Sequence, residues 1–145
     1  MLCAGKGKRV AEHINYSQKC MFPVYGKPLL AHIFEHFESV RLNRVYFVIG
    51  YKGNEIKNYF DWKGKGTEIR FIEDNGFEVD STSRSLLLTK PFIQEDFLYS
   101  QGEIFYEQHL IKKLYNFRMK GFSGVIAISK DVEIANTHPR VMISN

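Results

Sequence analysis

The order of apolar runs and amphipathic stretches along the chain predicts an α/β sandwich with a mostly parallel sheet. Short runs of β-branched and aromatic residues alternate with segments of helical periodicity. Residues 44–49 (Arg-Val-Tyr-Phe-Val-Ile) form a nearly continuous apolar run, which is typical of a parallel strand buried on both faces. The 145 residues are 44% hydrophobic and 25% charged, a composition that supports one folded domain with a core.

The first half of the chain alternates helix and strand. Residues 28–39 carry apolar side chains three and four positions apart, so we expect a helix whose first turn suits Pro28. The strand at 44–49 leads to a short helix at 54–60, and the next strand is expected at 68–72. The side chains expected to face inward from the first helix are Leu29, Ile33, Phe34 and Phe37.

The second half repeats this alternation. Residues 81–90 predict a helix that Pro91 stops, and a strand is expected at 97–100. An amphipathic helix at 107–120 is expected to end at Gly121. Further strands are expected at 124–129 and from residue 140, and the inward side chains of the last helix are Leu110, Ile111, Leu114 and Phe117.

Both ends of the chain look cut. Only Met1 to Ala4 precede the first glycine, whereas a typical strand runs about five or six residues. The last expected strand stops at Asn145 without a closing helix. We therefore expect residues 1–145 to form one domain that is incomplete at its N- and C-termini.

Net charge, the length of the apolar runs and the cysteine spacing narrow the expected partners and location of the protein. The net charge of +4 comes from cations that are spread along the chain, so a small anionic substrate is expected rather than nucleic acid. No apolar run approaches the roughly 20 residues that span a bilayer, so no membrane partner is expected. Cys3 and Cys20 lack metal-site spacing and predict two reduced, buried thiols in a cytoplasmic protein. A homo-oligomer is left open.

The opening segment carries the strongest functional signal. Residues 2–9 read Leu-Cys-Ala-Gly-Lys-Gly-Lys-Arg. Glycines let a backbone turn tightly and bring its N–H groups close to a ligand. Three cations (Arg9, Lys19 and Lys27) suit a ligand with several negative charges. The pattern predicts a site for a nucleoside triphosphate (NTP).

Several segments in register resemble the sugar-phosphate nucleotidyltransferases. The family opening reads Leu-Ala-Ala-Gly-x-Gly-x-Arg, then Pro-Lys, then Pro-Val-x-Gly-Lys-Pro, and residues 2–9, Lys19 and residues 23–28 follow it. The run at 48–52 (Val-Ile-Gly-Tyr-Lys) adds to the resemblance. It implies a Rossmann-like three-layer sandwich of the nucleotidyltransferase type. It also implies transfer of a nucleoside monophosphate from an NTP to a sugar phosphate or a phosphoalcohol such as phosphocholine, with release of pyrophosphate.

The resemblance also implies roles for individual residues. Arg9 stabilises the leaving pyrophosphate and Lys19 bridges the two phosphates that react, so both are expected to be catalytic. Glu103 stands in the place of the aspartate that holds the catalytic Mg²⁺. The expected nucleotide-binding residues are Ala4, Gly5, Lys6, Gly7 and Lys8 in the turn, with Asn75, Ser81 and Thr82 near the base or ribose. For Ser81 and Thr82, an N-cap of the following helix is an equal alternative.

The Ser-Leu pair at 85–86 is similar to the phosphocholine cytidylyltransferase branch, which favours CTP slightly. The chain also departs from the family pattern. Gln18 replaces the proline before the lysine, and Glu103 has one methylene more than the metal-binding aspartate. Cys3 and Lys8 replace an alanine and a threonine or serine. These departures leave open an alternative, a catalytically degenerate copy of the fold that binds nucleotide or has a regulatory or structural role.

Overall fold

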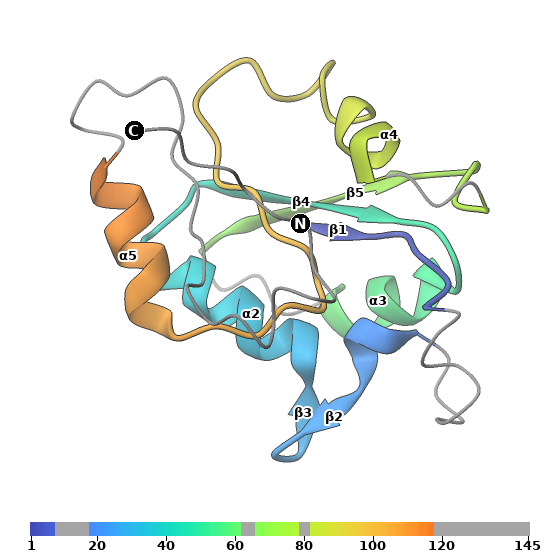
Figure 1. Cartoon of the computed structure of the whole chain (residues 1–145), viewed down its shortest axis with the longest axis horizontal. Coiled ribbons are helices and arrows are strands. Elements are labelled where there is room, and N and C mark those ends of the chain that lie inside the picture. The colour runs from blue at the N-terminus through green and yellow to red at the C-terminus, as the bar shows by residue number, and fades with distance from the viewer. Residues whose placement is uncertain (8–17, 62–65, 79–81, 118–145) are drawn as a thin grey trace, which may run out of the picture.

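The computed structural model describes residues 1–7, 18–61, 66–78 and 82–117 (Figure 1). Within these ranges, β1 (Leu2–Cys3), β4 (Arg44–Ile49) and β5 (Glu68–Glu73) form a parallel sheet in the order β1–β4–β5. Val48 of β4 lies opposite Leu2 on one side and Ile72 on the other. The predicted α/β class with a mostly parallel sheet is therefore confirmed.

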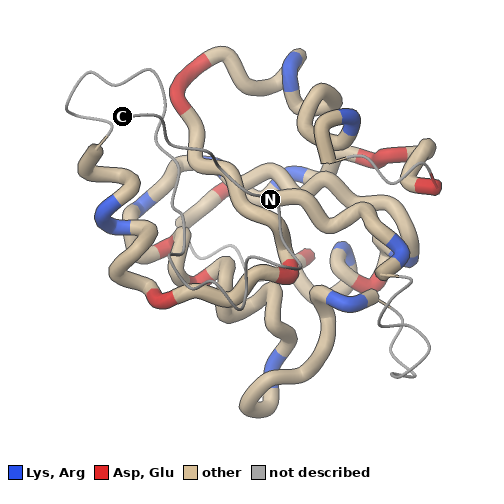
Figure 2. The backbone as a smooth tube through the Cα atoms, in the orientation of Figure 1, with Lys and Arg blue, Asp and Glu red and all other residues tan. Residues whose placement is uncertain are grey.

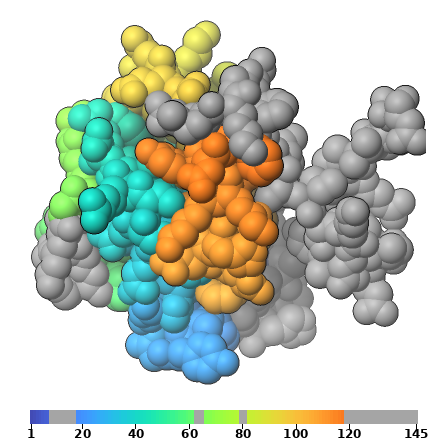
Figure 3. Space-filling view, turned by 90° about the vertical axis from the view of Figure 1, so that its left-hand side faces the viewer, coloured from blue at the N-terminus to red at the C-terminus, as the bar shows by residue number. Residues whose placement is uncertain are grey.

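Helices cover both faces of this sheet. On one face lie α2 (Leu29–Glu38), α3 (Gly53–Phe60) and α5 (Gln108–Phe117), and on the other lies α4 (Thr82–Leu87) (Figure 1). Figure 3 shows α5, in orange, packed against the cyan surface that includes α2. The layers are those that the resemblance implied.

The alternation of side chains along β4 explains its apolar run. Phe47 is fully buried on the face of α2 and α3, with its ring centroid 4.9 Å from that of Phe60 and 5.9 Å from that of Phe34. Val48, the next residue, is fully buried on the opposite face near Ile72. Burial of each such side chain contributes about 1.5–3 kcal/mol. Both faces of β4 therefore need apolar residues.

A short β-hairpin, which was not among the elements expected from the sequence, precedes α2. β2 (Pro23–Val24) pairs antiparallel with β3 (Lys27–Pro28). Its two central residues, Tyr25 and Gly26, have φ of 47° and 82°. Two residues with positive φ match the tight primed turn that suits the twist of a hairpin. Pro28 therefore lies in β3, directly before the helix rather than inside its first turn.

Two expectations for the second half are wrong. Residues 97–100 form no strand, because the neighbouring β1 has only two residues and offers a single bridge, Leu2 to Gln101. That bridge is held by hydrogen bonds from Leu2 N to Ser100 O and from Gly102 N to Leu2 O, both 2.9 Å. In α5, Ile111 is buried as expected, but Phe117 is 39% exposed at the end of the helix.

Other expectations differ little or lie outside the described residues. α3 begins at Gly53, one residue earlier than expected, and β5 extends one residue further, to Glu73. The strands expected at 124–129 and from residue 140 lie outside the described ranges. Among the described helices, none has the length and apolar character that crossing a bilayer requires. Figure 2 shows basic and acidic residues interspersed over the described chain.

Candidate functional site

The glycine turn leaves the carboxyl end of β1. Ala4 is buried, and its carbonyl accepts a hydrogen bond from Tyr51 N (3.0 Å) in the turn after β4. Gly7 has φ of +62°, a conformation that favours glycine, and a Cβ there would lie 3.1 Å from Lys19 Cδ. A Cβ on Gly5 would lie more than 4 Å from every other described residue except its chain neighbours. The turn is therefore anchored at Ala4 and passes close over the stem of Lys19.

Gln18 stabilises this turn through side-chain hydrogen bonds to the backbone. Its side chain is 2% exposed, and its amide nitrogen donates to Cys3 O (2.8 Å) and Tyr51 O (3.0 Å). These bonds join the end of β1 to the turn after β4 and bring η1 (Lys19–Met21), a short 3₁₀ helix, against both. A proline at this position has no side-chain donor. The substitution that the sequence showed as a departure thus has a structural role.

Lys19 and Glu103 form an ion pair. Lys19 Nζ lies 2.5 Å from Glu103 Oε1, and the two side chains are 26% and 34% exposed. Glu103 comes this close because Gly102 packs on the end of β1, where a Cβ would lie 2.5 Å from Cys3 Sγ. The structure therefore brings together the predicted catalytic cation, the predicted metal carboxylate and the predicted phosphate-binding turn.

The thiols beneath the turn are buried and free. A hydrogen bond with Cys3 and burial together raise the pKa of Cys20 well above its ordinary value. Cys20 is therefore a protonated thiol that packs as a small apolar side chain directly after Lys19.

Lys6 and Lys27 are also paired with carboxylates. Lys6 Nζ lies 2.7 Å from Glu78 Oε1 and 5.5 Å from the centroid of the Phe77 ring. Lys27, which the sequence grouped with the phosphate-binding cations, lies in β3 and pairs with Glu35 of α2. Lys6 therefore links the glycine turn to the turn that follows β5.

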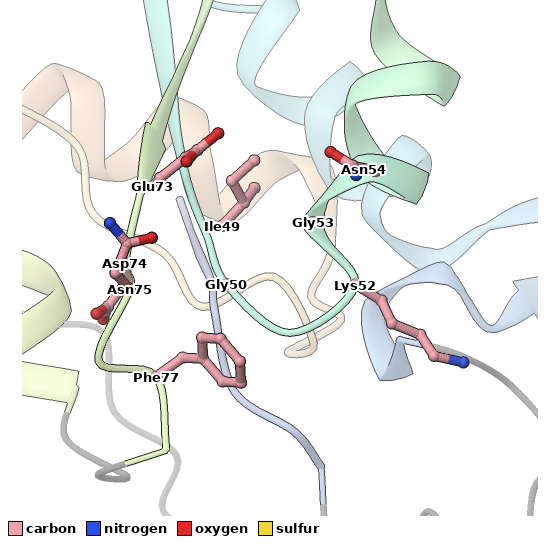
Figure 4. A pocket seen from close by; sticks show the side chains of 9 residues that line it. All are labelled: Ile49, Gly50, Lys52, Gly53, Asn54, Glu73, Asp74, Asn75 and Phe77. Atoms are coloured by element: carbon pink, nitrogen blue, oxygen red, sulfur yellow. The ribbon is translucent and has the colours of Figure 1, made fainter.

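A pocket of about 300 Å³ lies between the turns that follow β4 and β5 (Figure 4). In Figure 4, the Phe77 ring is directed toward the turn that carries Gly50, and Asn54 lies across the pocket from Glu73. Asn75, predicted to lie near the base, lines this pocket and is exposed. Its lining residues are Ile49, Gly50, Lys52, Gly53, Asn54, Glu73, Asp74, Asn75 and Phe77.

The remaining predicted residues are placed as follows. Thr82 is exposed and is the first residue of α4, so it is not the N-cap of that helix. Lys8, Arg9 and Ser81 lie outside the described residues, so their roles stay predictions.

Asp74 is a buried carboxylate that sequence reasoning missed. It directly follows β5, is 2% exposed, and accepts hydrogen bonds from Gly76 N (3.0 Å) and Ser85 Oγ (2.8 Å). It also forms an ion pair with Arg84 of α4. A signal was present in the sequence, because an acidic residue at the carboxyl end of a parallel strand lies where open α/β sheets place their sites.

A family model for the MobA-like NTP transferase domain matches residues 1–89, more than half of the chain. The chain belongs to this family. The match covers the glycine turn, Lys19, the hairpin and the sheet up to α4. The predicted membership of the sugar-phosphate nucleotidyltransferases is confirmed, whereas the likeness to the phosphocholine branch stays a prediction.

Curated relatives of this NTP transferase domain agree with that assignment. The bifunctional protein GlmU of Methanocaldococcus jannaschii is 36% identical over 110 residues, which are 76% of this chain and 26% of the relative. The UTP–glucose-1-phosphate uridylyltransferase AglF of Haloferax volcanii is 29% identical over 76% of this chain and 44% of its own length. The CMP-5'-(3-aminopropyl)phosphonate synthase of Streptomyces rubellomurinus is 25% identical over 79% of this chain and 18% of the relative. The chain thus spans well under two thirds of these proteins.

Proposed function

We propose that this NTP transferase domain moves a nucleoside monophosphate from an NTP to a sugar phosphate or a small phosphoalcohol and releases pyrophosphate. The observation that carries the proposal is the convergence of the glycine turn, Lys19 and Glu103 at the carboxyl end of β1. Open α/β sheets bind their ligands at this end of the strands. Membership of the family supports the same reaction. We also propose that residues 1–145 belong to one such domain in a cytoplasmic protein.

The proposed reaction is an in-line attack by a phosphate oxygen of the acceptor on the α-phosphorus of the NTP. Pyrophosphate leaves, and no covalent bond to the protein forms. Two anions must approach each other, so a fixed cation that contacts both lowers the barrier. We assign this role to Lys19, whose ammonium exchanges Glu103 for phosphate oxygens. Arg9 is proposed to stabilise the pyrophosphate as it leaves.

The glycine turn is proposed to hold the β- and γ-phosphates. Successive backbone N–H groups in such a turn form an anion-binding concavity. Among the residues that the structure describes, none other than the chain neighbours has an atom within 4 Å of the position of a Cβ on Gly5. Lys6 belongs to this turn, and its ammonium is proposed to exchange Glu78 for a phosphate oxygen. Lys8 is proposed to add a further positive charge.

Magnesium fits this donor set as an ion that arrives with the nucleotide. Among the described residues there is no group of three or more His, Cys, Asp or Glu that could hold a metal by itself. Mg²⁺ is usually bound through one or two carboxylates together with substrate phosphates, and Glu103 supplies one carboxylate beside the turn. When bound, the ion supplies neutralisation of charge on the triphosphate.

Within this proposal we favour CTP slightly as the nucleotide, with phosphocholine as a candidate acceptor. The support is the Ser-Leu pair at 85–86, together with a relative whose name contains CMP. UTP with a sugar-1-phosphate is the competing pair, because AglF is named for UTP and glucose-1-phosphate.

The test is a pyrophosphate-release assay on the full-length protein. CTP, UTP, GTP, ATP and dTTP are each combined with phosphocholine and with a set of sugar-1-phosphates, in the presence of Mg²⁺. Release that requires both substrates supports the proposal. Nucleotide binding without release with any acceptor supports the degenerate copy, an alternative favoured by Glu103 in place of an aspartate. A protein that binds none of the five nucleotides refutes both the transferase and a nucleotide-binding copy, and it leaves a regulatory or structural role for the fold.

A further inference from the structure

We propose that Asp74 is a positioning residue for the nucleotide: it fixes the turn at 74–78, and through this turn it fixes Lys6 in the glycine turn. The inference rests on the proposed function, because it assumes that the glycine turn holds the triphosphate. Asp74 is not expected to touch the substrate. It is expected to act through Phe77 and Glu78.

The contacts of Asp74 tie three parts of the fold together. Its backbone N–H donates to Ile49 O (2.8 Å), which extends the pairing of β5 with β4. One carboxylate oxygen accepts from Gly76 N at 3.0 Å and pairs with Arg84, and the other accepts from Ser85 Oγ at 2.8 Å. A buried carboxylate is costly unless it is paired and hydrogen-bonded. These bonds therefore hold β5, the turn and α4 in one arrangement.

The turn itself is packed tightly on both sides. A Cβ on Gly76 would lie 2.1 Å from Arg84 Nη1, so the guanidinium lies directly on the turn. A Cβ on Gly50 would lie 2.6 Å from Phe77 Cβ, so the start of the Phe77 side chain rests on the turn after β4 (Figure 4). Movement of the carboxylate or the guanidinium would therefore displace Phe77.

Phe77 and Glu78 then reach the glycine turn. The Lys6 ammonium lies 5.5 Å from the centroid of the Phe77 ring and 2.7 Å from a Glu78 carboxylate oxygen. The Tyr51 ring lies 6.2 Å from the Phe77 ring by centroids, and Tyr51 N donates to Ala4 O. The turn at 74–78 thus contacts Lys6 directly and is linked to Ala4 through Tyr51. A shift of this turn changes where Lys6 stands relative to the phosphates.

The experiment substitutes Asp74→Asn in the full-length protein. This change keeps the shape of the side chain and removes the charge that holds Arg84. The nucleotide is whichever of CTP, UTP, GTP, ATP and dTTP the intact protein binds most tightly. We expect its Kd to rise about three- to thirtyfold, the range typical of a residue that acts through neighbours. KM for the nucleotide should rise in parallel and kcat should change by less than about twofold, because the loss is in ground-state binding.

Glu68→Gln is the matched control. Glu68 lies at the opposite end of β5 and pairs with two arginines, Arg44 at 2.5 Å and Arg70 at 2.6 Å. Its substitution removes carboxylate–arginine pairs from the same strand without touching the turn, so Kd and KM should stay unchanged. An equal rise in Kd with Glu68→Gln would overturn the inference, since the effect would then come from general loosening of β5.

Ser85→Ala and Arg84→Gln are the second route if Asp74→Asn does not fold. Each removes one donor from the carboxylate, and each should raise Kd with the same split between KM and kcat. An unchanged Kd in folded variants overturns the inference, as does a fall in kcat at constant KM. An intact protein that binds no nucleotide refutes the proposed function itself, whereas binding that is insensitive to these substitutions refutes only the role of Asp74.

Discussion

Lys19→Ala should separate catalysis from stability. The Lys19–Glu103 pair is about a quarter to a third exposed, and ion pairs at such positions contribute about 0–1 kcal/mol. For a protein of this size or larger, 1 kcal/mol corresponds to about 2–4 °C in Tm. The melting temperature should therefore fall by only a few degrees. Turnover should fall by about 100- to 1000-fold, the loss typical when one group that stabilises developing charge is removed.

Two measurements on the same preparation decide this prediction. Pyrophosphate release gives kcat and KM, and circular dichroism at increasing temperature gives Tm. Lys57→Ala is the matched control, because Lys57 also pairs with a glutamate, Glu73 (2.6 Å), and lies on α3 rather than in the glycine turn or η1. Lys57→Ala should lower Tm by as little as Lys19→Ala does, and it should leave kcat and KM unchanged.

The opposite result would refute the assignment. If Lys19→Ala lowered Tm strongly and its folded fraction retained normal kcat, the lysine would serve only to hold the glycine turn through its contact with Gly7. Equal losses of activity in Lys19→Ala and Lys57→Ala would point to general electrostatics instead of a specific contact.

Three further predictions concern other variants of the same protein. Glu103→Asp should keep or raise turnover, because the shorter side chain matches the family's metal ligand; abolished release would show that the longer one is required. Gly50→Ala should lower the free energy of unfolding by about 1–3 kcal/mol in urea, since the methyl group would lie 2.8 Å from Ala4 O. Burial lowers the pKa of His36 from 6.5; Glu35 opposes this shift, while His32 and Lys27 add to it. The unfolded chain therefore binds this proton at a higher pH than the folded protein does. The free energy of unfolding should fall as the pH drops below 6.5, and it should fall less steeply in His36→Gln.

The fold was predictable wherever one short segment decides its own structure. The apolar run at 44–49 became β4 with the expected bounds, because its residues from Val45 to Ile49 are buried or half-buried on both faces of the sheet. The helix at 28–39 followed from its 3.6-residue period. The segment at 97–100 looked just as strand-like, but a strand also needs a partner, and β1 offers only two residues. Pairing partners do not appear in local sequence.

Sequence motifs predicted which residues belong to the site but gave no information about its three-dimensional arrangement. The resemblance to the nucleotidyltransferases implied that Gly7, Lys19 and Glu103 belong to one functional group, and the structure brings the three together. The importance of Asp74 was hidden because Glu73 stands next to it, and nothing local says which of two adjacent acids turns inward. The structure resolves this: Glu73 is exposed and Asp74 is 2% exposed.

The two carboxylates that face the loop cations differ in what it costs to displace them. The Glu78 side chain is 72% exposed, so water already screens its pair with Lys6 and a phosphate can replace it with little loss. Glu103 is 34% exposed and is held at the end of β1 by Gly102, so it stays beside the site after Lys19 turns to a phosphate. The same exchange that frees the Lys19 ammonium for the substrate therefore leaves a fixed carboxylate free for a cation. Under the proposed function, the ion pair between Lys19 and Glu103 is thus compatible with catalysis and is no sign of a degenerate site.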